Sequence, residues 1–369
     1  MNKVSAHDYH CSTNTLLWSI HLSITDFLVL NACNTLEAQA KWFMDPKNSM
    51  SSQQLNLGTF VLLVTAPLLW AGNALVARLL QDLVPPVLLN LLRWSLVFLL
   101  LLPLAGWVLR RQSALWRNWP RYMLLGFLGM GSYNTLLYLA LQTSSPINVT
   151  LVSSSIPLFT LVIGRVFYRQ AVASLSWLGL AASIVGVLVV LARGEIDRLL
   201  GLTLVPGDLL MVLASILWAW YSWLLSRPWP GEVDSKIQND WAAHLLAQTA
   251  MGLLWCAVFA SLEALWVSTQ AGQTAPVQWG WILGFGVLYV AIGPAILAYR
   301  CWGLAVTRAG PAITGMAANL IPLFTALLSL VVLAEAPEWY HGLSFLLIAG
   351  GLWITAHSQH QLNLEQESR

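Results

Sequence analysis

A few polar side chains interrupt the long apolar runs of this sequence, and they are its first candidates for binding chemistry. Asn73 follows Trp70 by one helical turn, and Arg93 lies well inside another apolar run. The Asn73 amide could bind a carbonyl or an amine, whereas the Arg93 guanidinium could anchor a carboxylate. The alternatives are that Asn73 forms a hydrogen bond between helices and that Arg93 extends its charge to a membrane surface.

Aromatic side chains form a second group of candidates. Trp70, Trp218 and Trp255 lie deep in apolar runs, and Tyr221 follows Trp218 in the same short segment. Tyr138 follows Asn134 by four residues, so that these two share a helical face. A cavity walled by such rings would suit amphipathic or aromatic solutes, and amines through cation–π contact. Packing against lipid or within the core is the alternative for each ring, and most of the 20 Trp residues are expected at membrane interfaces.

Two prolines form a third group. Pro157 and Pro322 lie inside apolar runs, and each follows a polar residue, Ser154 or Asn319, by three positions. A proline inside a helix removes a backbone hydrogen bond and kinks the helix. We therefore predict two matched polar breaks that contribute to a substrate-binding site. Kinking that serves only helix packing is the alternative.

No residue pattern predicts catalysis, a cofactor or a metal site. The sequence has no phosphate-binding loop and no HExxH or Gly-x-Ser-x-Gly motif, and its four Cys residues have no metal-ligand spacing. We therefore predict no catalytic residue, no cofactor and no metal ligand. An intramembrane enzyme is a distant alternative, because it would need a nucleophile–base set or a metal triad.

The elements that position these residues must lie in a membrane. Hydrophobic residues make up 57% of the 369-residue chain and charged residues only 9%, whereas soluble domains carry about 25% charged residues. This composition excludes a cytosolic enzyme, a disordered scaffold and a nucleic-acid-binding protein. The partners that it predicts are a lipid bilayer and a small-molecule substrate.

Ten apolar runs are long enough to cross a bilayer, which takes about 20 residues. We predict an all-α polytopic membrane protein with transmembrane helices at about residues 57–80, 87–109, 121–142, 147–168, 174–192, 207–226, 241–266, 278–302, 309–333 and 339–357. Alternate loops, such as the one with Arg110, Arg111 and Arg117, carry an excess of Lys and Arg. This excess marks the cytoplasmic side, so both termini are predicted to be cytoplasmic.

The sequence repeats itself. Ile156–Thr160 recurs unchanged as Ile321–Thr325, 165 residues later, and the same offset places Gly186 on Gly351. Residues 57–193 and 207–357 are therefore predicted to be two copies of a five-helix unit. Because five is odd, the second copy enters the membrane inverted. Inverted repeats are typical of secondary transporters, which bind substrate near the midplane and expose it alternately to each side.

The chain resembles the drug/metabolite transporter superfamily, and specifically its EamA-type members. The resemblance rests on Leu69–Asn73 with Arg78, on the small-residue and proline pattern of Ala140–Thr160, and on Ala305–Glu335. It implies export or exchange of amino acids, metabolites or drugs across the bacterial inner membrane, through a central cavity between the helices.

The predicted function is secondary transport by alternating access, with amino acids or related amines as the exported or exchanged metabolites. A multidrug or sugar-conjugate exporter of the same architecture is the alternative. Members of the family often end spans 4 and 9 with a glutamate, but here Gln170 stands at the point that matches Glu335. Small-residue faces such as Gly280 with Gly284 permit close helix packing and a homodimer.

The ends of the chain do not continue the repeat. The apolar run Leu16–Leu30 is broken by His21 and Asp26, and it lacks the features of a signal peptide. We predict that residues 1–56 are a poorly ordered extension, with residues 1–49 upstream of a native start at Met50; an eleventh span is the alternative. Residues 358–369 are predicted to form a cytoplasmic tail.

Overall fold

The apolar runs of the sequence form helices wherever the structure describes them. The computed structural model describes residues 56–80, 82–144, 149, 152–192, 194–195, 197, 200–201, 205–227, 236–269, 277–333 and 338–367. Regular structure in these residues is helical, with no strand among them. Residues 1–55, most of the predicted extension, lie outside them, as does Glu335.

Seven helical stretches in the described ranges are long and apolar enough to cross a membrane. Crossing requires a helix of this kind because the lipid core offers no partner for free backbone N–H and C=O groups. The stretches consist of α2 (Leu57–Leu80); α3 (Pro86–Ala105) with η2 (Gly106–Leu109); α5 (Trp119–Leu125), η3 (Gly126–Ser132) and α6 (Tyr133–Thr143); α11 (Pro206–Ser226); α13 (Trp241–Thr269); α14 (Trp281–Val290), η4 (Ala291–Leu297) and α15 (Ala298–Ala317); and α17 (Trp339–Glu367). The chain is therefore a multi-pass membrane protein.

Shorter helices lie in the remaining predicted spans. α8 (Ile156–Val166), α9 (Ser174–Leu191) and α16 (Leu320–Leu333) fall in the predicted fourth, fifth and ninth spans. Each is shorter than the 20 or so residues of a full crossing, so ten crossings stay a prediction. α4 (Ala114–Arg117) and α12 (Lys236–Asn239) are single turns between longer helices.

The break between predicted spans 8 and 9 lies later in the chain than the apolar runs suggest. α15 continues through residues 303–308 and loses helical geometry at Gly310, which has a φ of 83° and a ψ of 159°. Glycine tolerates this positive φ because it has no Cβ. Pro311 follows directly and stands at the start of a new helical segment, where its missing N–H costs little.

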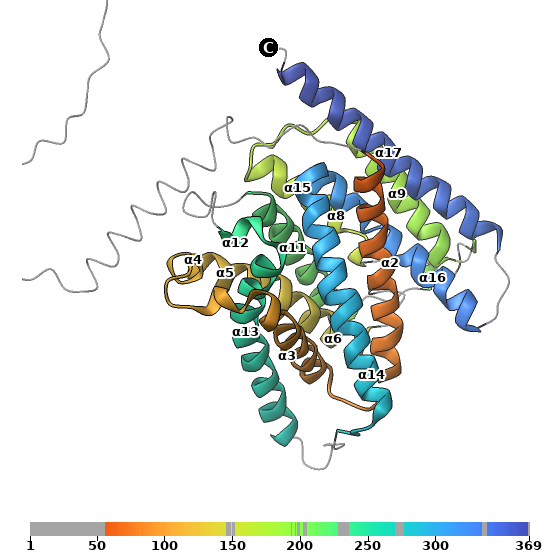
Figure 1. Ribbon diagram of the computed structural model, residues 1–369. Helices are drawn as coiled ribbons and strands as arrows, with labels where there is room; N and C mark the ends of the chain where they lie inside the picture. The colour runs from red at the N-terminus through yellow and green to blue at the C-terminus, as the bar shows by residue number, and fades with distance from the viewer. Residues whose placement is uncertain are drawn as a thin grey trace, which may run out of the picture. The chain divides into compact units, whose positions relative to one another are not determined.

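The principal helix contacts between the two predicted copies each have an equivalent contact in which the copies change places. α2 packs against α15 and α16, whereas α11 packs against α6 and α8. α3 pairs with α13, and α9 pairs with α17. Figure 1 shows α17 running beside α9, and α2 beside the stretch of α14 and α15.

In the contact between α9 and α17, individual residues of the two predicted copies also correspond. A Cβ at Gly186 would lie 3.0 Å from the carbonyl oxygen of Ser344. A Cβ at Gly351 would collide with the carbonyl oxygen of Gly179. Gly351 lies 165 residues after Gly186, and Ser344 lies 165 residues after Gly179. The same close approach therefore occurs twice, as it does at an interface with two-fold symmetry.

Two π-helical segments also stand at this offset. η3 (Gly126–Ser132) and η4 (Ala291–Leu297) each contain seven residues and begin 165 residues apart. π-helical turns are rare and occur frequently at functional sites. These segments were not predicted from the sequence, because their hydropathy is that of the flanking helices.

Pro157 and Pro322 do not kink the interior of a helix, so that part of the prediction was wrong. Pro157 lies in the first turn of α8 and Pro322 in the first turn of α16. The first N–H groups of a helix have no helical partner, so a proline removes no bond there. The polar breaks are instead the turns that precede the two helices, which contain Ser154 and Asn319.

Candidate substrate site

Aromatic side chains from five of the described helices meet in one cluster, which we call the aromatic centre. It comprises Trp70, Trp94, Tyr133, Trp218, Tyr221, Tyr299 and Trp302. Trp70 and Trp218, which open the two predicted copies, meet edge to face with ring centroids 5.2 Å apart. Trp302 lies 5.0 Å from Trp70. The structure thus brings the predicted residues Trp70, Trp218 and Tyr221 together.

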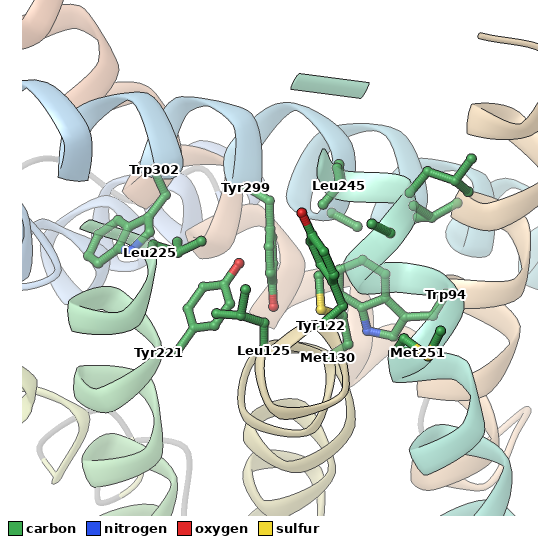
Figure 2. Close-up of a cluster of buried hydrophobic side chains, with 14 of the residues drawn as sticks. Trp94, Tyr122, Leu125, Met130, Tyr221, Leu225, Leu245, Met251, Tyr299 and Trp302 are labelled. Carbon is green, nitrogen blue, oxygen red and sulfur yellow. The ribbon is translucent and has the colours of Figure 1, made fainter. Parts of the chain in front are cut away.

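Tyr299 lies in the middle of the aromatic centre. Its ring centroid is 6.0 Å from that of Tyr221 and 5.0 Å from that of Trp94, and Figure 2 shows it between these two side chains. Tyr299 and Trp302 were not among the residues predicted from the sequence. Their spacing of three residues within a predicted span matches that of Trp218 and Tyr221, and this signal could have identified them.

The two π segments supply equivalent acceptors to the aromatic centre. The Nε1–H of Trp70 donates to the carbonyl oxygen of Pro294 in η4 at 3.0 Å. The hydroxyl of Tyr299 donates to the carbonyl oxygen of Gly129 in η3 at 2.5 Å. Gly129 and Pro294 are 165 residues apart. Each segment therefore binds an aromatic side chain that comes from the other half of the sequence.

Two further hydrogen bonds fix the rings that come from α11 and α15. The Tyr221 hydroxyl donates to Gln248 Oε1 at 3.0 Å, and the Nε1–H of Trp302 donates to the Ser222 hydroxyl at 3.1 Å. Tyr221 and Trp302 are almost fully buried. In this conformation the rings fill the centre themselves, so a substrate that bound there would have to displace some of them.

Arg93 is buried beside the aromatic centre, with 1% of its surface exposed. Its Nη1 donates to Asn134 Oδ1 at 3.2 Å and its Nη2 to the Pro294 carbonyl at 3.4 Å. The guanidinium carbon lies 5.1 Å from the centroid of the Trp94 ring. The alternative in which Arg93 extends to the membrane surface is therefore wrong, because α6 and η4 enclose the side chain.

Four of the predicted polar groups are buried with unpartnered atoms. Asn134 Nδ2, Tyr138 Oη and Asn73 Oδ1 have no hydrogen-bond partner, and Asn319 has none at either Oδ1 or Nδ2. Each of these side chains is less than one-tenth exposed. Buried polar atoms are normally paired, so these atoms are candidates for binding a polar ligand.

The remaining predicted residues lie at the edge of this region. Ser154, Pro157 and Pro322 are buried, and they lie at or beside the starts of α8 and α16. Their neighbours Ile156 and Ile321 pack in the same hydrophobic cluster as Trp218 and Tyr299. The helices that follow the two polar breaks, α8 and α16, therefore begin in the same hydrophobic cluster as the aromatic centre.

Comparisons with known proteins agree with this architecture. Residues 57–192 match the model of the EamA-like transporter family. A solved crystal structure covers 82% of this chain and 98% of its own at 21% identity, with a TM-score of 0.63. At that identity the likeness concerns the fold.

Curated relatives are named as transporters. An uncharacterized transporter of Archaeoglobus fulgidus is 24% identical over 83% of this chain and 100% of its own length. The uncharacterized transporter YyaM of Bacillus subtilis is 25% identical over 60% of this chain and 68% of its own. The aromatic amino acid exporter YddG of Ancylobacter novellus is 25% identical over 78% of this chain and 93% of its own.

The family match and the relatives confirm the resemblance drawn from Leu69–Asn73 and the later motifs. The long apolar helices of this chain agree with the membrane location expected of relatives that are named as transporters. Over residues 57–192, the chain is therefore similar to the EamA-like transporter family.

Proposed function

We propose that this protein is a secondary transporter that exports or exchanges small metabolites across the bacterial inner membrane by alternating access. Its substrates are amino acids or related amines that carry an aromatic or apolar body. In this proposal the chain forms two inverted five-helix repeats, and the substrate binds between them at the aromatic centre.

The observation that carries the proposal is the matched pair of π segments. Gly129 and Pro294 occupy equivalent positions in η3 and η4, and each accepts a hydrogen bond from a ring of the aromatic centre. Equivalent acceptors in the two halves allow two packings of similar free energy, one open to each side of the membrane. Secondary transporters built from inverted repeats place their substrate sites at such junctions.

The chemistry of the aromatic centre favours solutes with flat or apolar groups. Rings at centroid distances of 5.0–5.5 Å form edge-to-face and tilted pairs, which are the preferred arrangements of aromatic side chains. A substrate ring could replace one protein ring in such a pair at little cost. The name of the relative YddG, an aromatic amino acid exporter, supports this class of substrate.

Reconstituted vesicles test the proposal. Purified protein in liposomes loaded with unlabelled L-phenylalanine should accumulate labelled L-phenylalanine from outside by counterflow. Vesicles with and without a pH gradient distinguish proton coupling from facilitation. If folded protein moves none of a panel of amino acids and amines, the proposal fails.

A pair of tryptophan variants provides the matched comparison. Trp218→Ala removes a ring from the middle of the aromatic centre, whereas Trp177→Ala removes one from the surface of α9, where Trp177 is 40% exposed. We expect Trp218→Ala to reduce counterflow at least tenfold and Trp177→Ala to leave it near the wild-type rate. Equal rates for both variants would exclude the aromatic centre as the site.

A further inference from the structure

Arg93 lies on the buried face of α3. Asn90, Arg93, Trp94 and Val97 follow the helical spacing of three and four residues, and all four are buried. This spacing places them on one face of the helix. Asn90 Nδ2 donates to the Met130 carbonyl of η3 at 3.0 Å, so this face is held against the π segment.

The hydrogen-bond partners of the Arg93 guanidinium are all uncharged. They are the amide oxygen of Asn134 and the backbone carbonyl of Pro294, and the Nε–H group is buried without a partner. An arginine has five N–H donors in one plane. The guanidinium therefore keeps unused donors, including the one on its Nε edge.

Two carboxylates of the long helices, Glu263 of α13 and Asp208 of α11, are engaged elsewhere. Glu263 of α13 accepts hydrogen bonds from the backbone N–H groups of Val87 and Leu88, in the first turn of α3. Asp208 accepts from the backbone N–H of Val205 and from the Ser144 hydroxyl. Among the described residues, no carboxylate forms a hydrogen bond with Arg93.

A buried cation without a counter-charge is expensive in a membrane protein. Desolvation of an ion costs several kcal/mol unless an opposite charge and hydrogen bonds compensate, and charges in membrane spans commonly mark substrate pathways. The missing anion must then come from outside the described residues. A carboxylate fits the guanidinium edge through two parallel hydrogen bonds.

We propose that Arg93 binds the carboxylate of the transported substrate and thereby selects amino acids and aromatic carboxylates over simple amines. The inference rests on the proposed function, and it narrows the substrate class. Trp94 lies under the guanidinium, and Tyr299 packs against Trp94 with centroids 5.0 Å apart. A bound carboxylate would thus leave the rest of the substrate beside the aromatic centre, while the positive charge would repel an amine that lacks a carboxylate.

Three solutes with the same phenyl ring distinguish the effect of the carboxylate from that of the amine. 3-Phenylpropionate carries only the carboxylate, phenethylamine only the amine, and L-phenylalanine both. In counterflow with wild-type protein, we expect L-phenylalanine and 3-phenylpropionate to compete at concentrations at least tenfold lower than phenethylamine, because a charge-assisted hydrogen bond is worth this factor or more. Stronger competition by phenethylamine would overturn the inference while leaving transport itself established.

Two substitutions then test the residue. Arg93→Gln should raise the half-saturating concentration of 3-phenylpropionate about tenfold or more, with a smaller change for phenethylamine. Arg93→Lys keeps the charge but loses the paired geometry, so it should recover part of the preference for carboxylates. If both variants keep the wild-type selectivity, Arg93 does not bind the carboxylate.

Failure to fold is distinguished from failure to bind. Size-exclusion elution and the thermal midpoint show whether each variant folds, and the wild-type competition series stands without any variant. If the wild-type protein moves none of the three solutes and none competes, the proposed function fails, and this inference fails with it.

Discussion

Asn319 is a buried amide whose side chain forms no stabilising hydrogen bond in this conformation. Its side chain is fully buried, and neither its oxygen nor its nitrogen has a hydrogen-bond partner. Leaving a buried polar group unpaired costs about 1–3 kcal/mol. Such a cost is recovered only when the group is paired in another state, and binding of a substrate provides one.

Asn319→Leu should therefore separate stability from transport. We expect the variant to keep or raise the thermal midpoint, because it removes unpaired polar atoms from the core, and to lower the transport rate. Asn90→Leu is the matched control, since it removes the bond from Asn90 Nδ2 to the Met130 carbonyl and should lower the midpoint. A similar loss of stability in both variants would contradict the expected role of Asn319.

Single residues also show where sequence reasoning stops. The polarity of Arg93 and Asn134 within apolar runs marked both as candidates, and the structure joins them through one hydrogen bond. The burial of Arg93 could not be predicted, because it depends on α6 and η4, which approach α3 only in the folded chain. The aromatic centre was predicted only in part. Trp70 and Trp218 each lie in a Leu-Trp-Ala segment that marks them in the sequence, whereas the place of Tyr299 between the other rings depends on tertiary packing.

At the scale of elements, the first turn of α3 receives its cap from another helix. The backbone N–H groups of Val87 and Leu88 donate to the two carboxylate oxygens of Glu263 at 3.1 and 2.9 Å. A helix N-terminus has unpaired N–H groups and a partial positive charge, so a carboxylate stabilises it. This contact ties α13 to the start of α3.

Glu263→Gln should weaken that tie. The substitution preserves the shape of the side chain, but the amide nitrogen cannot accept a hydrogen bond. One of the two charge-assisted hydrogen bonds is therefore lost and the other is weakened, and we expect a loss of about 1–2 kcal/mol. Thermal unfolding in detergent measures it. Asp82→Asn, at an exposed position, is the control and should change little. Equal midpoints for Glu263→Gln and the wild type would contradict the capping role.

The close approach of α9 and α17 gives a second prediction at this scale. Gly351→Ala would place a methyl group against the Gly179 carbonyl, whereas Gly350→Ala would meet no atom within 4 Å. We expect Gly351→Ala to destabilise the protein by about 1–3 kcal/mol, as overpacking does. Gly350→Ala should be neutral or slightly stabilising. The reverse order of midpoints would show that the helices are packed differently.

Helical elements were predicted well where hydropathy defines them and poorly where backbone geometry does. The long apolar runs became helices, and the 165-residue offset recurs in η3 and η4. Hydropathy does not indicate where the π segments lie or where the helix breaks at Gly310. The glycine and proline residues there are flanked by residues as apolar as those of a regular span.

At the scale of the whole molecule, orientation in the membrane is the prediction to test. The loop that follows α3 and η2 contains Arg110 and Arg111, and such loops stay cytoplasmic. In a variant without its native cysteines, Gln112→Cys should react with a membrane-impermeant maleimide only after cells are permeabilised. Ser268→Cys, near the end of α13, should react in intact cells. The opposite pattern would reverse the assigned orientation.

The π segments have a consequence for anyone who redesigns this chain. Each residue turns an α-helix by about 100°, and a π segment holds an additional residue in its turn. The direction in which Tyr299 and Trp302 face therefore depends on η4, which precedes them in the same helical stretch. A regular helix grafted over Ala291–Leu297 with one residue fewer would preserve hydropathy yet swing Tyr299 away from Gly129. A redesign must therefore keep the additional residue of η3 and of η4 before any side chain of the aromatic centre is chosen.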